Sequence, residues 1–276
     1  MSSIRNGPST IFYETYGDTG DPVALIHGSL VDKRSWGAIL APLGANLQVL
    51  AYDRRGYGES TGPSRIHSVR DDAQDLAELL EATGLYPAHL VAHSYAGAVA
   101  LRLAADRPEL VRSMALHEPP LIGLLAQEAD GTAEVQRWKH RIDDLRRDVR
   151  SGEKERATRE VVNTFSSREG AWNRLPLEAR QQALRYIGLW AEEFADPEAV
   201  EPDPAALKEV CIPVLLTMGE NSPSLVRRMA EILAARLSNG TLQSIPGAGH
   251  TPHVTSPDRY LGILTTFLLE RNVPTV

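Results

Sequence analysis

The sequence predicts an α/β fold, with a mostly parallel sheet flanked by helices and a helical insertion. Continuous apolar runs of strand length, such as Pro22–His27 and Leu47–Tyr52, are typical of strands buried on both faces. Segments with helical periodicity lie between such runs, and this alternation indicates parallel strands joined by right-handed crossovers. In the middle of the chain the strand pattern stops and charged helical segments dominate. We therefore expect a core formed by residues 1–120 and 208–276, and a helical cap at residues 121–207.

Length and composition indicate an ordinary enzyme-sized protein. The 276 residues suit one large α/β domain with an insertion. The net charge of −7 is spread along the chain, and the Arg-rich run over residues 137–150 alternates with Asp, so we expect no nucleic-acid partner. No stretch has the apolar length of a membrane span, and residues 1–10 lack the apolar core of a signal peptide. We expect no membrane association and a cytoplasmic location.

The single cysteine and the first elements carry local expectations. Cys211 excludes disulfide scaffolds and thiolate metal sites, and its place before Ile212-Pro213 suggests a buried structural thiol. Thr10–Tyr16 alternates and is rich in β-formers, so we expect an edge strand there. The remaining elements follow the predicted alternation: a capped helix over Ser68–Gly84, strands at Leu90–Ala92, Val111–Leu116, Ile212–Met218 and Leu242–Ile245, cap helices at Thr132–Ser151, Lys154–Phe165 and Leu175–Phe194, and helices at Leu225–Leu237 and after Ser256.

Two loops that follow buried strands invite a functional interpretation. His27-Gly28-Ser29-Leu30 places a glycine directly after a strand, which leaves the following N–H groups free to form an oxyanion hole. The simpler alternative is a turn that only ends the strand. The loop over residues 53–60 has two glycines but no following G-K-[ST], so we prefer a structural turn to a phosphate loop. We expect Asp53 in this turn to pair with Arg54 or Arg55.

The strand Leu90–Ala92 runs directly into a helix of small residues, with Ser94 at the corner. This is the layout of a nucleophile elbow, in which a sharp strand-to-helix turn exposes one hydroxyl above a parallel sheet. The usual pattern is G-x-S-x-G, whereas here Ala92 and Ala96 flank the serine and Gly97 follows one place later. Alanine is compatible because the turn needs small side chains on both sides.

Four motifs follow one another along the chain: His27-Gly28, Asp53-x-x-Gly56-x-Gly58-x-Ser60, Ala92-x-Ser94-x-Ala96-Gly97 and Gly249-His250. In this order they resemble the α/β-hydrolase fold family, in its branch with a helical cap after the sixth core strand, over essentially the whole chain. The resemblance implies Ser94 as nucleophile, His250 as general base, and the N–H groups of Ser29 and Tyr95 as oxyanion hole. A serine hydroxyl needs such an imidazole to take its proton. His253 is a rival base without a preceding glycine, and we expect His93 to pack beside the elbow.

The triad acid is where the chain departs from the family pattern. The family usually has Asp after the seventh strand, but Ser222 stands there in Gly219-Glu220-Asn221-Ser222-Pro223. Some capped members take a carboxylate from the end of the sixth strand instead, where this chain has Glu118 before two prolines. We therefore expect Glu118 to orient His250. Three alternatives remain open here: Glu220 is the acid, Glu118 only anchors the entrance of the cap, or no acid operates.

A serine nucleophile favours acyl chemistry, whereas dehalogenases and epoxide hydrolases of the family use Asp. We expect a carboxylic ester or lactone hydrolase acting on an apolar small molecule, with Leu30, Trp172 and Trp190 contacting the substrate. The histidines do not form H-E-x-x-H or another metal-binding spacing, so neither a metal nor a cofactor is expected. The alternative is a weakly hydrolytic or non-hydrolytic ligand receptor or biosynthetic cyclase on the same fold, which the missing Asp keeps open.

Overall fold

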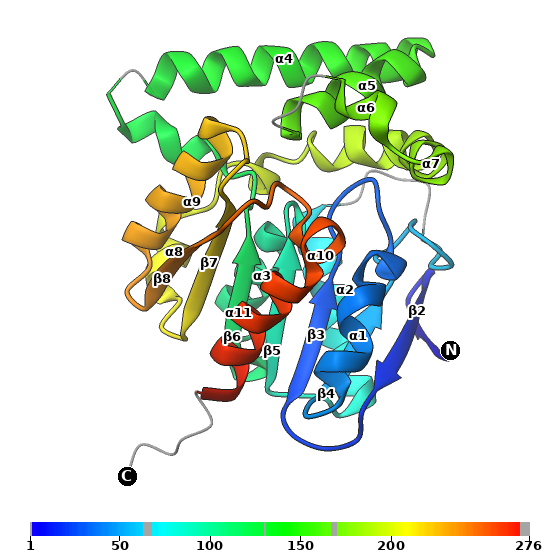
Figure 1. Ribbon diagram of the computed structural model, residues 1–276, viewed down its shortest axis with the longest axis vertical. Helices are drawn as coiled ribbons and strands as arrows, with labels where there is room; N and C mark the ends of the chain where they lie inside the picture. The colour runs from blue at the N-terminus through cyan, green and yellow to red at the C-terminus, as the bar shows by residue number, and fades with distance from the viewer. Residues whose placement is uncertain (1, 63–67, 130, 167–169, 271–276) are drawn as a thin grey trace.

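The computed structural model describes residues 2–62, 68–129, 131–166 and 170–270. Eight strands form one sheet in the order β1-β2-β4-β3-β5-β6-β7-β8, with helices on both faces (Figure 1). The strands are β1 (Ser2–Asn6), β2 (Ser9–Tyr16), β3 (Pro22–Ile26), β4 (Gln48–Tyr52), β5 (Ala88–His93), β6 (Val111–His117), β7 (Val214–Gly219) and β8 (Gly240–Ile245). From β4 to β8 the neighbours in the sheet are parallel, and β2 runs antiparallel to both β1 and β4.

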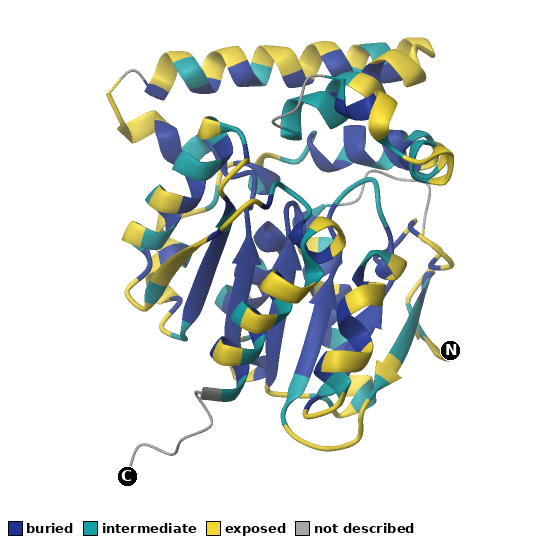
Figure 2. Ribbon diagram, in the orientation of Figure 1, coloured by how far each residue is buried: buried dark blue, intermediate teal, exposed yellow. Residues whose placement is uncertain are grey.

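The predicted α/β class is confirmed, and one strand assignment is wrong. The segment at Thr10–Tyr16 is not an edge, because Ser2–Asn6 pairs with its outer side. That short N-terminal strand is polar and largely exposed, so it carries no apolar alternation from which it could be predicted. The central strands β3, β5 and β6 are almost fully buried, as their continuous apolar runs require (Figure 2).

Helices of the core cover the two faces of the sheet. Trp36, α1 (Gly37–Gly44) and α11 (Pro257–Glu270) pack on one face, against alternate residues of β3 and β4 such as Leu25 and Val49. The opposite face is covered by α2 (Val69–Thr83), α3 (Ala96–Asp106) and α9 (Ser224–Arg236). A capping box between Ser68 and Asp71 starts α2, and Gly84 in the left-handed conformation ends it, as predicted.

The segment between β6 and β7 is helical and lies over the end of the sheet that carries Ser94 (Figure 1). Its aromatic side chains gather around Phe194, whose ring centroid lies 5.1 Å from Trp190, 5.8 Å from Trp138 and 6.5 Å from Phe165. This apolar cluster holds the helices together and borders the cavity described below. The elements of the segment are η3 (Ile122–Gln127), α4 (Gly131–Ser151), α5 (Lys154–Phe165), α6 (Ala171–Arg174), α7 (Leu177–Glu193), η4 (Pro197–Ala199) and α8 (Pro204–Glu209).

Two further expectations are corrected by the structure. Cys211 is exposed, because β7 begins only at Val214 and the cysteine belongs to the preceding loop. Asp53 does not pair with its neighbouring arginines; it accepts from Lys33 Nζ at 2.8 Å, while Arg54 and Arg55 turn towards carboxylates of α2. Among the described helices, none combines the length and apolarity needed to cross a membrane.

Candidate active site

Ser94 stands at the sharp turn between β5 and α3. Its φ of 55° lies in the left-handed region, which is costly for a residue with a side chain and is held here by backbone hydrogen bonds. The Ser94 N–H donates to the carbonyl of His117 at 2.8 Å, and Gly97 N–H donates back to the Ser94 carbonyl at 2.8 Å. A Cβ on Gly97 would lie 2.7 Å from Cβ of Pro119. Glycine therefore allows the loop after β6 to approach the elbow.

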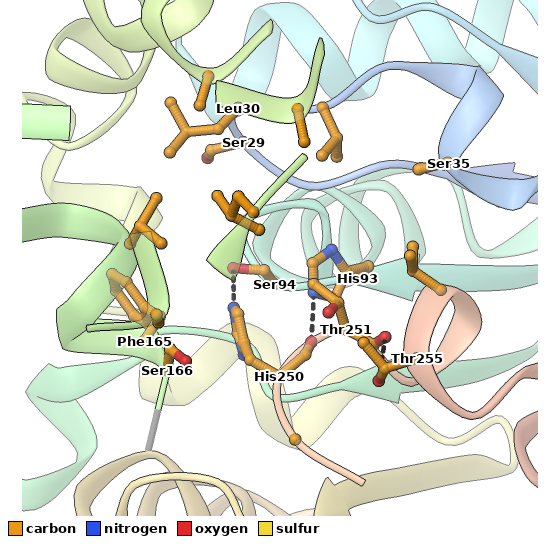
Figure 3. A pocket seen from close by; sticks show the side chains of 18 of the residues that line it. Ser29, Leu30, Ser35, His93, Ser94, Phe165, Ser166, His250, Thr251 and Thr255 are labelled. Atoms are coloured by element: carbon orange, nitrogen blue, oxygen red, sulfur yellow. Dashed lines mark hydrogen bonds between the residues drawn. The ribbon is translucent and has the colours of Figure 1, made fainter. Parts of the chain in front are cut away.

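A chain of hydrogen bonds links Ser94, His250 and Glu118. The Ser94 hydroxyl lies 3.1 Å from His250 Nε2, and His250 Nδ1 lies 2.7 Å from Glu118 Oε2 (Figure 3 shows the serine and the imidazole). Because an ionised carboxylate can only accept, Nδ1 carries the proton and Nε2 is left to accept from the serine. The structure thus brings together three residues that lie far apart in the sequence.

Glu118 is fully buried at the end of β6, with a φ of 48°. Burial alone raises the pKa of its carboxyl, but the neighbouring His117, the hydrogen-bonded His250 and the Ser222 hydroxyl outweigh burial and lower that pKa to about 2. Its other oxygen, Oε1, accepts from the Gly219 N–H at 2.7 Å. The carboxylate is therefore ionised at neutral pH and has a fixed orientation towards His250.

The rival residues lie elsewhere. Glu220 accepts from the Gly247 N–H at 2.7 Å on the surface, whereas the carboxylate bonded to His250 is that of Glu118. His253 is buried behind the site, with its ring centroid 4.3 Å from Trp36. Ser222 occupies the position of the usual Asp and is buried.

His93 makes a hydrogen bond that could not be predicted from its position in the sequence. Its Nε2 donates to the carbonyl of His250 at 2.7 Å, which fixes the loop that carries the predicted base. Burial first, and then the neighbouring histidines, lower the pKa of His93 well below its usual range, so the ring is neutral. A Cβ on Gly28 would come within 2.6 Å of His93 Nδ1. The glycine after β3 therefore makes room for this ring.

The two predicted oxyanion-hole residues follow neighbouring strands. Ile26 of β3 and Ala92 of β5 are paired in the parallel register, so Ser29 and Tyr95 each stand three residues beyond that pair. Within the described residues, neither backbone N–H donates to a protein acceptor. Ser29 lines the same cavity as Ser94, and Leu30 beside it has a φ of 65°. Neither amide is therefore engaged by another part of the described chain, and their role as an oxyanion hole stays a prediction.

A cavity of about 780 Å³ opens above Ser94 (Figure 3). This volume falls in the range of small-molecule sites. Its wall includes the predicted contact residues Leu30 and Trp190, whereas Trp172 is not among the residues that line it. Trp172 is buried within the helical segment instead. The apolar side chains of α5 and α7 on the wall are Val161, Val162, Phe165, Ala179, Ala183 and Trp190.

One cluster has the spacing of metal ligands. Nitrogen and oxygen atoms of His117, Glu118 and His250 lie within 4.8 Å of one another. A cation there would have to replace the proton between His250 and Glu118. Metal binding and the hydrogen-bonded relay are therefore mutually exclusive at this cluster.

Comparison with known proteins places this geometry in a family. The sequence profile described as "Alpha/beta hydrolase family" matches residues 23–263. The chain belongs to the alpha/beta hydrolase family. One relative is a Synechocystis protein provisionally named a non-heme chloroperoxidase. It is 28% identical to this chain, over 94% of each of the two chains.

Solved structures of the alpha/beta hydrolase fold match closely along the whole chain. A thermophilic esterase from Thermogutta terrifontis matches with a TM-score of 0.78 and 24% identity, over 98% of this chain and 99% of that one. Est816, described as an N-acyl homoserine lactone degrading enzyme, matches with a TM-score of 0.77 and 19% identity, over 96% and 100% of the two chains. At these identities the likeness shows the shared fold.

Sequence reasoning missed a second buried carboxylate beside the elbow. Glu193, near the end of α7, is fully buried and accepts from Ser29 Oγ at 2.5 Å. It follows Tyr186 and Trp190 at helical spacing, on the buried face of α7. A carboxylate on an otherwise apolar helix face was the signal that could have identified it.

Proposed function

We propose that the protein is a serine hydrolase that cleaves a carboxylic ester or lactone of an apolar small molecule through an acyl-enzyme on Ser94. Family membership supports hydrolase activity in general terms. The observation that carries the specific proposal is the Ser94–His250–Glu118 chain of hydrogen bonds facing a mainly apolar cavity. The helices at residues 121–207 act in this proposal as a cap that shapes the cavity.

In the first half-reaction, Ser94 Oγ attacks the substrate carbonyl while His250 Nε2 takes the hydroxyl proton. The backbone N–H groups of Ser29 and Tyr95 stabilise the negative charge on the former carbonyl oxygen. His250 then gives the proton to the departing alkoxide, which leaves as an alcohol. Glu118 keeps the imidazole in the correct tautomer and stabilises the imidazolium through Nδ1–H.

In the second half-reaction, His250 Nε2 takes a proton from a water molecule, which attacks the acyl carbonyl. The tetrahedral intermediate collapses, Ser94 recovers its proton, and the carboxylic acid leaves. In a lactone the alcohol and the acid remain one molecule, so the product is a hydroxy acid. The cycle uses no group beyond the chain and water.

The cavity supports an apolar substrate of moderate size. Phe165 stacks on His250 with a centroid distance of 5.2 Å, and Trp190 and Phe194 line the same cavity. An esterase and a lactone-degrading enzyme are among the proteins with the same fold, which agrees with this substrate class without selecting between ester and lactone. The receptor or cyclase alternative depended on a missing acid, and Glu118 beside His250 favours the hydrolase.

A panel of p-nitrophenyl esters and γ- and δ-lactones tests the proposal with wild type and Ser94→Ala. We expect turnover by the wild type, and a loss of about 10⁶-fold in kcat in the variant, the scale seen when a serine nucleophile is removed. Thermal unfolding of the variant controls for folding. Absence of turnover across the panel, combined with tight binding of apolar ligands, would favour the receptor.

A further inference from the structure

Glu193 links the helical segment to the loop that follows β3. Its Oε2 accepts from the Ser29 hydroxyl at 2.5 Å, and its Oε1 accepts from Arg54 Nη2 at 2.6 Å and from Tyr57 Oη at 2.9 Å. All three donors belong to the core, whereas Glu193 belongs to α7. The Glu193 carboxylate therefore connects the helical segment to the core, and it lies 164 residues from Ser29 in the sequence.

The burial of this charge is compensated by one arginine. Arg54 is fully buried between Glu193 and Asp72, and these carboxylates raise its pKa well above the usual value against the opposing effect of burial. Arg54 also donates to the backbone carbonyls of His27 at 2.9 Å and Gly28 at 3.2 Å. The ion pair is thus tied to the backbone immediately before Ser29.

The same loop is held on its other side by a second carboxylate. Asp32 accepts from Gln182 Nε2 at 2.8 Å and from Tyr186 Oη at 3.1 Å, and both donors lie on α7. Between the two attachment points lies Leu30, whose φ of 65° is unfavourable for a side chain of its type. A loop with such a residue keeps its conformation only where its surroundings enforce it.

We propose that Glu193 is a positioning residue of the oxyanion hole, acting through the Ser29 hydroxyl to fix the direction of the Ser29 N–H. This inference rests on the proposed function, in which that N–H binds the oxyanion. The Ser29 hydroxyl donates to Glu193, and the Ser29 backbone N–H has no protein acceptor in the described part of the chain. Helix α7 is then part of the catalytic scaffold as well as of the cavity wall.

A purely structural role makes a different prediction. If Glu193 only fastens the cap to the core, every loss of a Glu193 contact lowers stability alike and leaves the rate per folded molecule unchanged. If it positions the oxyanion hole, only the Ser29 contact affects the chemical step. The two contacts can be removed separately, because Ser29 and Tyr57 bond different oxygens of the carboxylate.

The test compares Ser29→Ala with Tyr57→Phe, using kcat, KM and thermal unfolding on the ester or lactone that wild type hydrolyses fastest. Ser29→Ala keeps the backbone N–H and loses only its tether. We expect kcat to fall about tenfold with KM unchanged, less than the 10²–10³-fold loss for removing an oxyanion donor outright. Tyr57→Phe, the matched control, should keep kcat within about twofold of wild type.

A double-variant cycle completes the test. Glu193→Gln should lower kcat in the wild-type background and have little further effect on kcat in Ser29→Ala, because both changes break the same contact. Equal kcat values for Ser29→Ala and an active wild type would overturn the inference and leave the proposed function standing. A wild type without turnover on any ester or lactone would overturn both.

Discussion

Glu118 and Glu193 are both fully buried carboxylates on either side of the elbow, yet they are compensated in different ways. Glu118 faces an imidazole and a backbone N–H and has no arginine or lysine partner among the described residues. Glu193 is paired with the buried Arg54 and a tyrosine hydroxyl. The first arrangement leaves a negative charge available to stabilise a cation that forms during the reaction. The second cancels the charge beside the place where an oxyanion would form.

The two sides also differ in origin. The acid side is assembled from the ends of β5, β6 and β7 and the loop after β8, all within the core. The proposed oxyanion side also includes contacts from α7 of the helical segment, since Glu193 accepts from Ser29 and both Gln182 and Tyr186 donate to Asp32. Changes to the cap are therefore expected to affect the oxyanion side more than the acid side.

Of the changes to the two sides, Glu118→Gln on the acid side has the largest expected effect. An amide can present N–H to His250 Nδ1 and favour the wrong tautomer. We therefore expect kcat to fall by about 10⁴-fold, the scale seen in serine proteases when the buried triad Asp is changed to Asn. Steady-state kinetics on the best substrate measures this. Glu220→Gln is the matched control and should keep wild-type kcat; the reverse pattern would make Glu220 the acid.

A smaller effect is expected from displacing the acid side without removing its charge. Gly97→Ala adds a Cβ 2.7 Å from Pro119 and pushes the loop that carries Glu118 away from the elbow. A shift of about 1 Å can cost about 10²-fold in kcat, which kinetics with a thermal-unfolding control would measure.

Gly188→Ala provides the comparison for Gly97→Ala, because it is also a helical glycine but has open space around its Cβ position. It should leave kcat unchanged and raise stability by up to about 1 kcal/mol. Full activity in Gly97→Ala would show that the close packing of Pro119 does not position the acid.

A further expected effect, on stability and not on kcat, concerns the neutral histidines behind Glu118 and His250. Burial, followed by His117, His250 and His27, lowers the pKa of His253 from 6.5 to about 3. The unfolded chain therefore binds a proton at His253 more readily than the folded chain does. Protonation of His253 leaves the free energy of unfolding unchanged above pH 6.5 and lowers it as the pH falls from 6.5 towards 3. At pH 5 the loss is about 2 kcal/mol, from 1.36 kcal/mol per pKa unit.

His253→Leu tests this pH dependence. Both ring nitrogens of His253 lack a hydrogen-bond partner among the described residues, so an apolar side chain costs no such bond. Denaturant unfolding of wild type and variant at pH 8, 6.5 and 5 gives the free energy of unfolding of each protein as a function of pH. We expect a flatter curve for the variant below pH 6.5, and parallel curves would contradict the assignment.

Much of the fold and of the acid side could be predicted from the sequence. Buried parallel strands can be recognised as apolar runs, and their carboxyl ends meet at one edge of the sheet. Because Ser222 stands in the place of the usual Asp, the acid had to come from another strand end. Glu118, at the end of the sixth core strand of the family, was the candidate. Local pattern and strand order were sufficient for that side.

The oxyanion side could be predicted only in part. The roles of Ser29 and Tyr95 in the oxyanion hole stay predictions from their motifs. The partner of Ser29 lies on a helix whose docking no local pattern specifies. Trp172 is buried but does not line the cavity, and periodicity shows that a side chain is buried and not which neighbour it contacts. The expectation of a buried Cys211 was wrong because β7 begins at Val214, two residues after the strand start expected at Ile212.

The central claim is that substrate carbon becomes bonded to Ser94. Rapid-quench mass spectrometry during turnover of a p-nitrophenyl ester, followed by peptide mapping, tests it most directly. The account predicts a transient mass increase of one acyl group on the peptide that contains Ser94, absent in Ser94→Ala. Turnover without any adduct on that peptide, or with the acyl group on another residue, would contradict it.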